Sequence, residues 1–349
     1  MITPGDRLPN LPRARGPLTE LVLDQLRTAP RDEGGAALDA LIDATEGFLA
    51  GVEDPLADDD FQLALYVLYG LHYRSFHGVD PAWEWNPTAL VVRGRLETVF
   101  ERAIRDLTPA AAPGPEPVGK VLFELEAADD GPPLSRYLER EGSLEDFKEF
   151  VIHRSAYQLK EADPHSWAIP RLTGAPKTAL LEVQFDEYGS GRPERMHSLL
   201  FAKTMAALDL DIGEDSYLDR LPGITLATVN LMSFFGLHRR NRGALVGHLA
   251  MFEMTSSKPN RAYGNGLRRF GYGQEATDFY DEHVEADAVH ENIAAYDMAG
   301  GLADREPELA GDILFGAAAL LKVEARFAEY LLGRWERGES SLYAERVAA

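Results

Sequence analysis

Apolar residues in this chain recur every three to four positions, and strand-like alternation is scarce. That spacing places apolar side chains on one face of a helix, and such a face must be covered by another helix. The pattern therefore predicts an all-α bundle. Helices are expected at 18–27, 36–50, 61–76, 90–107, 143–162, 175–187, 194–208, 226–235, 243–255, 275–296 and 309–335.

Prolines mark two breaks in this pattern. Several lie within or beside residues 1–16, which predicts an irregular arm, and four more lie within 108–118. Because proline has no amide hydrogen and a fixed φ, the second group predicts a connector. We therefore expect an N-terminal helical extension at 1–118 and the main domain at 119–349. The aromatic run that begins at Phe61 is expected either to cover the core or to form a homodimer surface.

Composition excludes several functions. Cysteine is absent, which rules out disulfides, thiolate metal sites and cysteine nucleophiles, so a metal would have to be held by His, Asp and Glu. The net charge of −22 comes from 35 basic and 57 acidic residues, without the basic footprint of a nucleic-acid binder. No apolar run is long enough to span a membrane, and the N-terminus lacks a signal-peptide core. A cytoplasmic protein is the expectation.

His283, Asp287 and His290 lie in a segment that is expected to be helical. At 3.6 residues per turn, steps of four and seven residues put all three on one face. Two imidazoles and a carboxylate on one stripe form half of a coordination shell, and these donors suit iron or manganese. The alternative is an exposed helix face that carries two histidines.

Glu187 and His197 are ten residues apart, separated by Gly189, Gly191 and Pro193. These residues predict a break between two helices, from which both side chains could approach one metal. The alternative is a helix that ends at Gly189 beside an unrelated histidine.

Two further glutamates have metal-binding potential. Glu161 precedes Pro164, so its helix is expected to kink or end just beyond the carboxylate. Glu253 lies in an otherwise apolar helix, where a buried carboxylate needs a cation. The alternatives are a surface position for Glu161, and solvent or an arginine partner for Glu253.

Together these residues match, in identity and order, the iron ligands of the heme-oxygenase-like diiron oxidases, also called iron-containing redox enzymes. The matching set is Glu161, Glu187, His197, Glu253, His283, Asp287 and His290. The chain resembles this family over roughly residues 120–335. The ten-residue Glu–His gap and the His-x3-Asp-x2-His pattern are similar to the N-oxygenase branch, in particular to the central domain that builds the N-nitrosourea group.

The resemblance implies a seven-helix, heme-oxygenase-like core and a non-heme site with two Fe(II) ions. It implies O2 as co-substrate and is compatible with an external electron donor. Four ligands would serve mainly the first iron, namely Glu187, His197, Glu253 and His283. The second would be served mainly by Glu161, Asp287 and His290. Glu187 is the expected bridge.

The resemblance also implies a small, amine- or carboxylate-bearing substrate of amino-acid type, with N-oxygenation in specialised metabolism as the expected reaction. The same site could instead perform desaturation, cyclisation or C–C cleavage on an amino or fatty acid. An arginine fork suits a carboxylate, and Arg239, Arg240 and Arg242 are the candidates. Their alternative is surface charge near a helix junction. Asp186 and Glu285 are expected either to orient ligands or to be merely exposed.

Two other functional classes remain open at this stage. A heme-binding protein of similar fold needs one proximal histidine and leaves the other six residues unexplained. For a non-catalytic helical scaffold, His283→Ala should leave iron content and O2 consumption unchanged.

Overall fold

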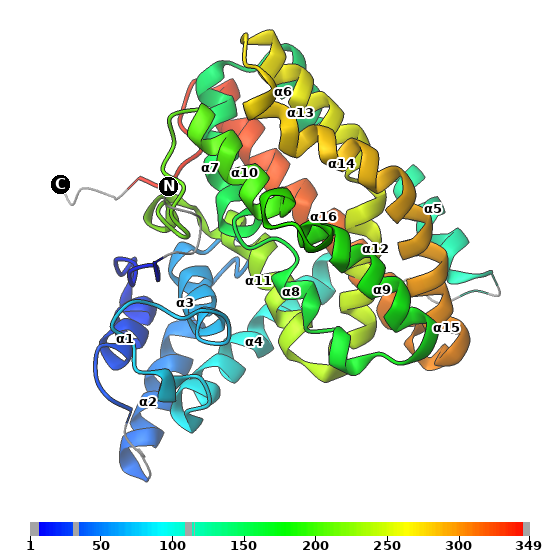
Figure 1. Cartoon of the computed structure of the whole chain (residues 1–349). Coiled ribbons are helices and arrows are strands. Elements are labelled where there is room, and N and C mark those ends of the chain that lie inside the picture. The colour runs from blue at the N-terminus through cyan, green and yellow to red at the C-terminus, as the bar shows by residue number, and fades with distance from the viewer. Residues whose placement is uncertain (1–6, 31–34, 109–113, 115, 345–349) are drawn as a thin grey trace.

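In the computed structural model, the described residues form helices joined by turns and loops, and no β-strand occurs among them (Figure 1). The structure describes residues 7–30, 35–108, 114 and 116–344, apart from the side chains of Ala37 and of residues 286–289. The prediction of an all-α fold is confirmed. Residues 109–113 and 115, on which most of the predicted connector falls, lie outside the described part.

Four N-terminal helices gather at one corner of the molecule, at the lower left of Figure 1. They are α1 (Pro17–Leu26), α2 (Ala36–Leu49), α3 (Asp59–Gly70) and α4 (Pro87–Leu107). Helix α3 packs on α11 (Gly223–Leu237), where Asn230 Nδ2 donates to the Gln62 carbonyl over 2.9 Å. The buried apolar side chains of these four helices and of the later helices form one continuous core.

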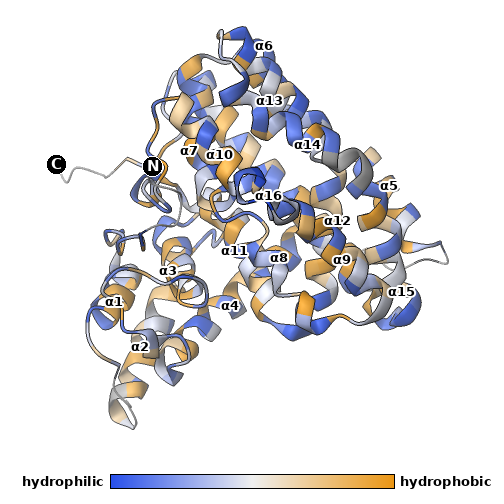
Figure 2. Ribbon diagram, viewed as in Figure 1, coloured by the Kyte–Doolittle hydropathy of each residue, from blue (hydrophilic) through white to orange (hydrophobic). Residues whose placement is uncertain are grey.

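The later helices build the larger body of the molecule. Besides α11, they are α5 (Val118–Ala127), α6 (Leu134–Arg140), α7 (Leu144–Gln158), α8 (Asp163–Ser166), α9 (Gly174–Glu187), α10 (His197–Ala207), α12 (Arg242–Met254), α13 (Ser257–Arg269), α14 (Gln274–Asn292), α15 (Gly301–Arg305) and α16 (Ala310–Glu336). The polar helices α13 and α14 run along the outer edge, whereas the apolar helix α12 lies inside (Figure 2). Helix α14 passes directly into a π-helix at Ile293–Gly300, a form that often occurs at functional sites.

Several helix boundaries differ from the predicted ones. The helix expected at 61–76 ends at Gly70, and the one expected at 143–162 ends at Gln158. Helices α5, α6 and α13 were not expected. Helix α13 contains Gly264 and Gly266, which disfavour a helix, but a Cβ at Gly266 would lie 2.8 Å from the Leu138 carbonyl oxygen. Close packing on α6 therefore outweighs low helix propensity there.

Helices α12 and α16 cross with their backbones in contact. A Cβ added at Gly247 would lie 1.8 Å from the carbonyl oxygen of Ile313, and one at Gly316 would lie 1.9 Å from that of Ala244. Glycine at both positions therefore permits the crossing, which places α12 deep in the core.

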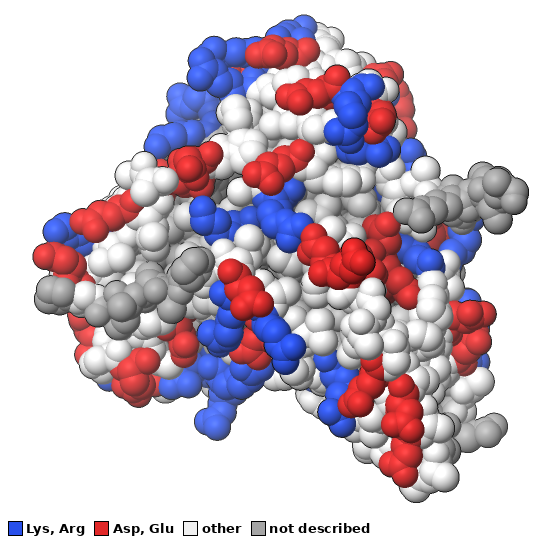
Figure 3. All heavy atoms as spheres, turned by 180° about the vertical axis from the view of Figure 1, so that it is seen from behind, with Lys and Arg blue, Asp and Glu red and all other residues white. Residues whose placement is uncertain are grey.

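The charged surface is mixed. On the face opposite to that of Figure 1, acidic and basic side chains are interspersed (Figure 3). In the described part of the chain, every helix falls short of the combined length and apolar character that crossing a bilayer requires.

Candidate metal centre

Glu161 lies in the turn between α7 and α8. Helix α7 begins with a capping box, in which Asp146 N donates to Ser143 Oγ (3.1 Å) and Ser143 N donates to Asp146 Oδ2 (2.8 Å). After α7 ends, Ala162 adopts a left-handed φ of 73°, which is unusual for a residue other than glycine. This turn buries the Glu161 carboxylate inside the molecule instead of letting the helix carry it onward.

Glu187 and His197 come from two helices joined by a chain reversal, as the glycines and proline between them predict. Helix α9 ends at Glu187 and α10 begins at His197. Gly189 has a φ of 78°, and a Cβ there would lie 2.6 Å from Met196 N. Only glycine fits such a close return of the backbone, which brings His197 back to Glu187.

Glu253, His283 and His290 come from two further helices. Glu253 is near the end of α12, and both histidines are on α14, with the π-helix beginning three residues after His290. All three side chains are buried. The solvent or surface alternatives for Glu253 and for the two histidines are therefore excluded.

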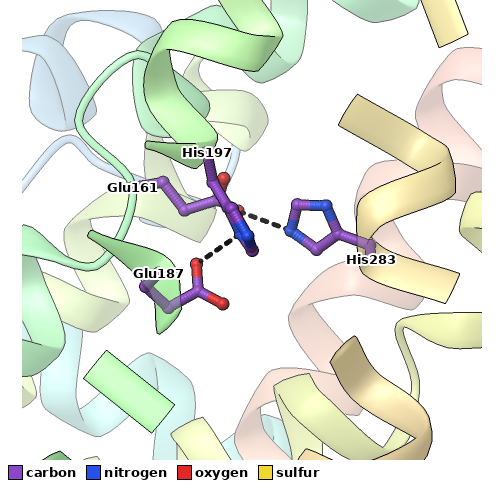
Figure 4. Close-up of side chains that lie close together, drawn as sticks. All are labelled: Glu161, Glu187, His197 and His283. Carbon is purple, nitrogen blue, oxygen red and sulfur yellow. Dashed lines mark ion pairs between the residues drawn. The ribbon is translucent and has the colours of Figure 1, made fainter. Parts of the chain in front are cut away.

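A first group of potential metal donors joins Glu161, Glu187, His197 and His283, whose donor atoms all lie within 4.8 Å of one another. Figure 4 shows these four side chains pointing toward a common centre. His197 Nδ1 lies 2.9 Å from Glu187 Oε2, and His283 Nε2 lies 3.6 Å from Glu161 Oε1.

A second group joins Glu187, Glu253 and His290 within the same limit. His290 Nδ1 lies 3.3 Å from Glu253 Oε2. Glu187 belongs to both groups, so its carboxylate lies between two sets of donors.

This grouping differs from the division implied by the resemblance. The structure places Glu161 with His197 and His283, and it places Glu253 with His290. The reason is local: the left-handed turn at Ala162 sends Glu161 toward the imidazole of His283. Asp287 was expected beside His290, but its side chain lies outside the described residues.

The charge of the cluster shows whether a metal fits it. Among the described residues, no lysine or arginine forms an ion pair with Glu161, Glu187 or Glu253, and Oε2 of Glu161 has no hydrogen-bond partner. Buried carboxylates without a cation are costly. Imidazole and carboxylate donors are those that non-heme iron prefers, so the residues fit a metal site.

The pKa values of the clustered side chains also indicate that the carboxylates need a nearby positive charge. Burial raises the pKa of Glu161 and of Glu253 above the usual value. Burial also opposes ionisation of Glu187, but the neighbouring His197 outweighs it and lowers the pKa of this carboxyl. Although burial disfavours a charged imidazole, Glu253 raises the pKa of His290 to about 9. Without a metal, a proton on His290 therefore offsets part of the negative charge of the carboxylates.

Two contacts orient the histidines. His283 donates from Nδ1 to the carbonyl oxygen of Phe279 over 2.7 Å, which fixes the tautomer and turns Nε2 to the cluster. Asp186 Oδ2 lies 3.1 Å from His290 Nε2, so Asp186 contacts a candidate ligand as one of the two sequence interpretations expected. Glu285, in contrast, is exposed.

The three arginines proposed for substrate binding are not brought to this cluster. Arg240 makes two hydrogen bonds to Glu101 of α4, and Arg242 pairs with Glu306. Arg242 begins α12 and Glu253 is eleven residues further on, a separation of about 16 Å along the axis. Arg239 is exposed beside them. The junction between α11 and α12 therefore lies at the far end of α12 from the donors.

A cavity of about 300 Å³ is lined by residues that neighbour three of the donors in sequence, although none of the six clustered donors lines it. Its walls include Phe201, four residues after His197, and Tyr280, three residues before His283. These spacings put each aromatic residue on the same helix face as the donor. Sequence reasoning missed the cationic residue of this cavity, Arg154, although it lies on the helix that leads to Glu161, seven residues before it.

The helical architecture and the buried cluster define a helical protein with a buried group of donors that could hold metal ions. The model of one family, described as iron-containing redox enzyme, matches residues 148–325, which is half of the chain and includes all six clustered donors. The chain belongs to this family of oxidoreductases and has its heme-oxygenase-like helical fold. No curated protein matches the chain significantly.

Proposed function

We propose that this protein is an O2-dependent, non-heme diiron oxidoreductase that acts on a small, amino-acid-like metabolite. The observation that carries the proposal is the place of Glu187 in both donor groups. A carboxylate shared by two buried donor groups can bridge two adjacent metal ions, as two-metal sites need ligands close to both ions.

The proposed roles follow from the two groups. Glu161, His197 and His283 would hold one iron, Glu253 and His290 the other, and Glu187 would bridge them. Asp287 is retained as a proposed ligand beside His290. Two Fe(II) ions held by these residues would supply electrons for the reduction of O2, and an external donor would restore them where the reaction requires it.

The chain's own contribution is to hold and shield the site. The Phe279 carbonyl keeps His283 in one tautomer, and Asp186 orients His290. Phe279 also packs against His283 with a ring separation of 4.4 Å, and Phe201 packs on Phe279. This aromatic layer excludes bulk water from the donors.

For the reaction itself we propose N-oxygenation, on the similarity of the Glu–His gap to the N-oxygenase branch. Desaturation, cyclisation or C–C cleavage at the same centre is the alternative. The two outcomes differ in product mass, because oxygenation adds an oxygen atom and desaturation removes two hydrogens.

The test starts with anaerobic titration of the metal-free protein with Fe(II), for which we expect two irons per chain. The loaded protein is then incubated with amino acids and fatty acids under O2, and products are analysed by mass spectrometry. A chain that binds no iron, or that instead binds hemin with a new Soret absorption band, contradicts the proposal.

A further inference from the structure

Arg154 of α7 and Glu324 of α16 form an ion pair in the wall of the cavity of about 300 Å³, which also includes the exposed Asp129. Arg154 Nη1 donates to Glu324 Oε1 over 2.9 Å, and Nη2 donates to Oε2 over 2.7 Å. The guanidinium also lies over the ring of Phe327, at 4.5 Å from its centroid. The guanidinium of Arg154 is thus held in one orientation. Glu324 accepts from two of its five N–H groups and leaves three that it does not use.

Two buried polar atoms at this cavity lack a protein partner. Oε1 of Gln158 and the hydroxyl of Tyr280 have no hydrogen bond within the described part of the chain, and both residues line the cavity. A buried polar atom without a partner is costly, so these atoms indicate a polar ligand. Most of the remaining wall is apolar, including Phe201 and Phe252.

The charge of the wall indicates which ligand it suits. Arg154 and Glu324 balance each other and Asp129 adds a negative charge, so a fatty acid would bring a further negative charge to a wall whose arginine is already paired. A zwitterion brings one charge for each partner, with its carboxylate on N–H groups of Arg154 that Glu324 does not use and its ammonium on Glu324. Of the amino-acid and fatty-acid substrate classes, the wall favours the amino acid.

The position of the pair sets the orientation of that ligand. Arg154 and Gln158 are one turn apart on α7, and Glu161 follows at the turn where α7 ends. At 1.5 Å per residue, Gln158 lies about 6 Å along α7 from Arg154, and Glu161 follows three residues after the helix ends. A ligand held at Arg154 by its α-carboxylate would therefore extend its side chain past Tyr280 toward the donors.

We propose that Arg154 and Glu324 bind the carboxylate and ammonium groups of a free α-amino acid, so that the reacting atom lies on its side chain. This inference rests on the proposed function for the identity of the neighbouring centre. The binding itself depends only on the cavity, so it is measurable without iron.

The experiment is isothermal titration calorimetry of the full, metal-free chain with a panel of common L-amino acids and with hexanoate, octanoate and dodecanoate. For the tightest amino acid, the analogues lacking the amine or the carboxylate are titrated as well. We expect each analogue to bind at least about tenfold more weakly, the ratio that about 1.4 kcal/mol produces. Tighter binding of a fatty acid, or equal binding of the analogues, overturns the proposal without need of a variant.

Two variants locate the site. Arg154→Lys keeps the charge but removes the fork and should weaken amino-acid binding about tenfold. Glu324→Gln should remove the preference for the amino acid over its des-amino analogue. Arg326→Lys is the matched control. Arg326 is on α16, as is Glu324, but it pairs with Asp54 and does not line the cavity. Unchanged affinity in folded Arg154→Lys contradicts the assignment.

Failure of this inference is distinguishable from failure of the proposed function. Amino-acid binding without any iron binding would leave the cavity assignment standing and remove the diiron proposal. Iron binding and O2 consumption without amino-acid binding would leave the diiron proposal standing and remove the cavity assignment.

Discussion

Oε2 of Glu187 lies 2.9 Å from Nδ1 of His197, although a chain reversal separates the end of one helix from the start of the next. Neither helix could make this contact by its own periodicity. The reversal depends on Gly189, whose backbone passes so close to Met196 that a side chain has no room. The geometry of two candidate ligands is thus set by a residue that carries no donor.

Gly189→Ala is expected to disturb this contact more than Gly191→Ala does. Both glycines have a φ of 78°, but only at Gly189 would the added Cβ meet another backbone atom, 2.6 Å away. Backbone strain alone should cost Gly191→Ala about 1 kcal/mol of unfolding free energy. The added clash should bring Gly189→Ala to about 2–3 kcal/mol, with reduced iron binding. Urea unfolding and iron analysis measure both, and equal losses would contradict the close approach.

Glu187→Gln should lower bound iron by more than the loss of one ion. The amide keeps the shape of the side chain but cannot bridge two cations, and Glu187 belongs to both donor groups. We expect less than half of the wild-type iron content after anaerobic loading and desalting. Glu182→Gln, at an exposed position of the same helix, is the control and should retain full loading. Wild-type loading of folded Glu187→Gln would be incompatible with a bridge.

Asp186→Asn should weaken iron binding without abolishing it. Asp186 contacts His290 at 3.1 Å, and loss of a carboxylate that orients a histidine ligand typically reduces metal affinity about 10- to 100-fold. Competition with a chelator measures the affinity of the weaker site. Glu285→Gln, which alters an exposed residue of α14, should show no change. An equal effect of both variants would indicate general electrostatics instead.

His153 should make the protein sensitive to acid. It is buried between Thr225 and Ser341, and burial lowers its pKa to about 3. Below about pH 6.5, the pKa of His153 in the unfolded chain, the unfolded chain binds a proton on this residue that the folded chain does not bind. Stability therefore falls as the pH drops from about 6.5 to 3, with a slope of about 1.4 kcal/mol per pH unit from this group.

The variant His153→Gln cannot gain that proton, so its unfolding free energy should depend less steeply on pH between about 6 and 4. Urea unfolding at a series of pH values compares the two slopes. Parallel curves for the variant and the wild type would show that His153 is not the responsible group.

Gly316→Ala should be strongly destabilising, because its Cβ would lie 1.9 Å from the Ala244 carbonyl oxygen. We expect a loss of about 3 kcal/mol or more, which is the upper range for overpacking. Gly333→Ala, on the same helix, meets no atom closer than 3.6 Å and should instead gain about 0.5–1 kcal/mol from helix propensity. Thermal unfolding of the two variants checks these opposite signs.

The helical fold and the type of the clustered donors could be predicted from sequence, because apolar spacing and residue identity are local properties. The break between Glu187 and His197 was predictable for the same reason, since glycine and proline act within a few residues. The grouping of Glu161 with His283 was not, because it depends on the left-handed Ala162, where no glycine marks the turn.

Long-range pairing limited the prediction of the substrate site. Arg240 looked suitable as a free guanidinium, but it is neutralised by Glu101, from a helix far earlier in the chain. Arg154 was not among the predicted candidates. Its role at the cavity depends on Glu324, which comes from α16, far away in the sequence. Nothing within either local segment reveals these partners.

The direct contact between the α12 and α16 backbones has a consequence for selectivity. Glu253 is on α12 and Glu324 is on α16. Because glycine lies at the crossing, the two helix backbones pack directly on each other without a flexible side chain between them. The distance between the candidate metal donors and the Arg154–Glu324 pair is therefore fixed. A substrate bound at Arg154 and Glu324 would be oxidised at the atom that this fixed distance places at the donors, so homologues one methylene shorter or longer should react at a different atom or not at all.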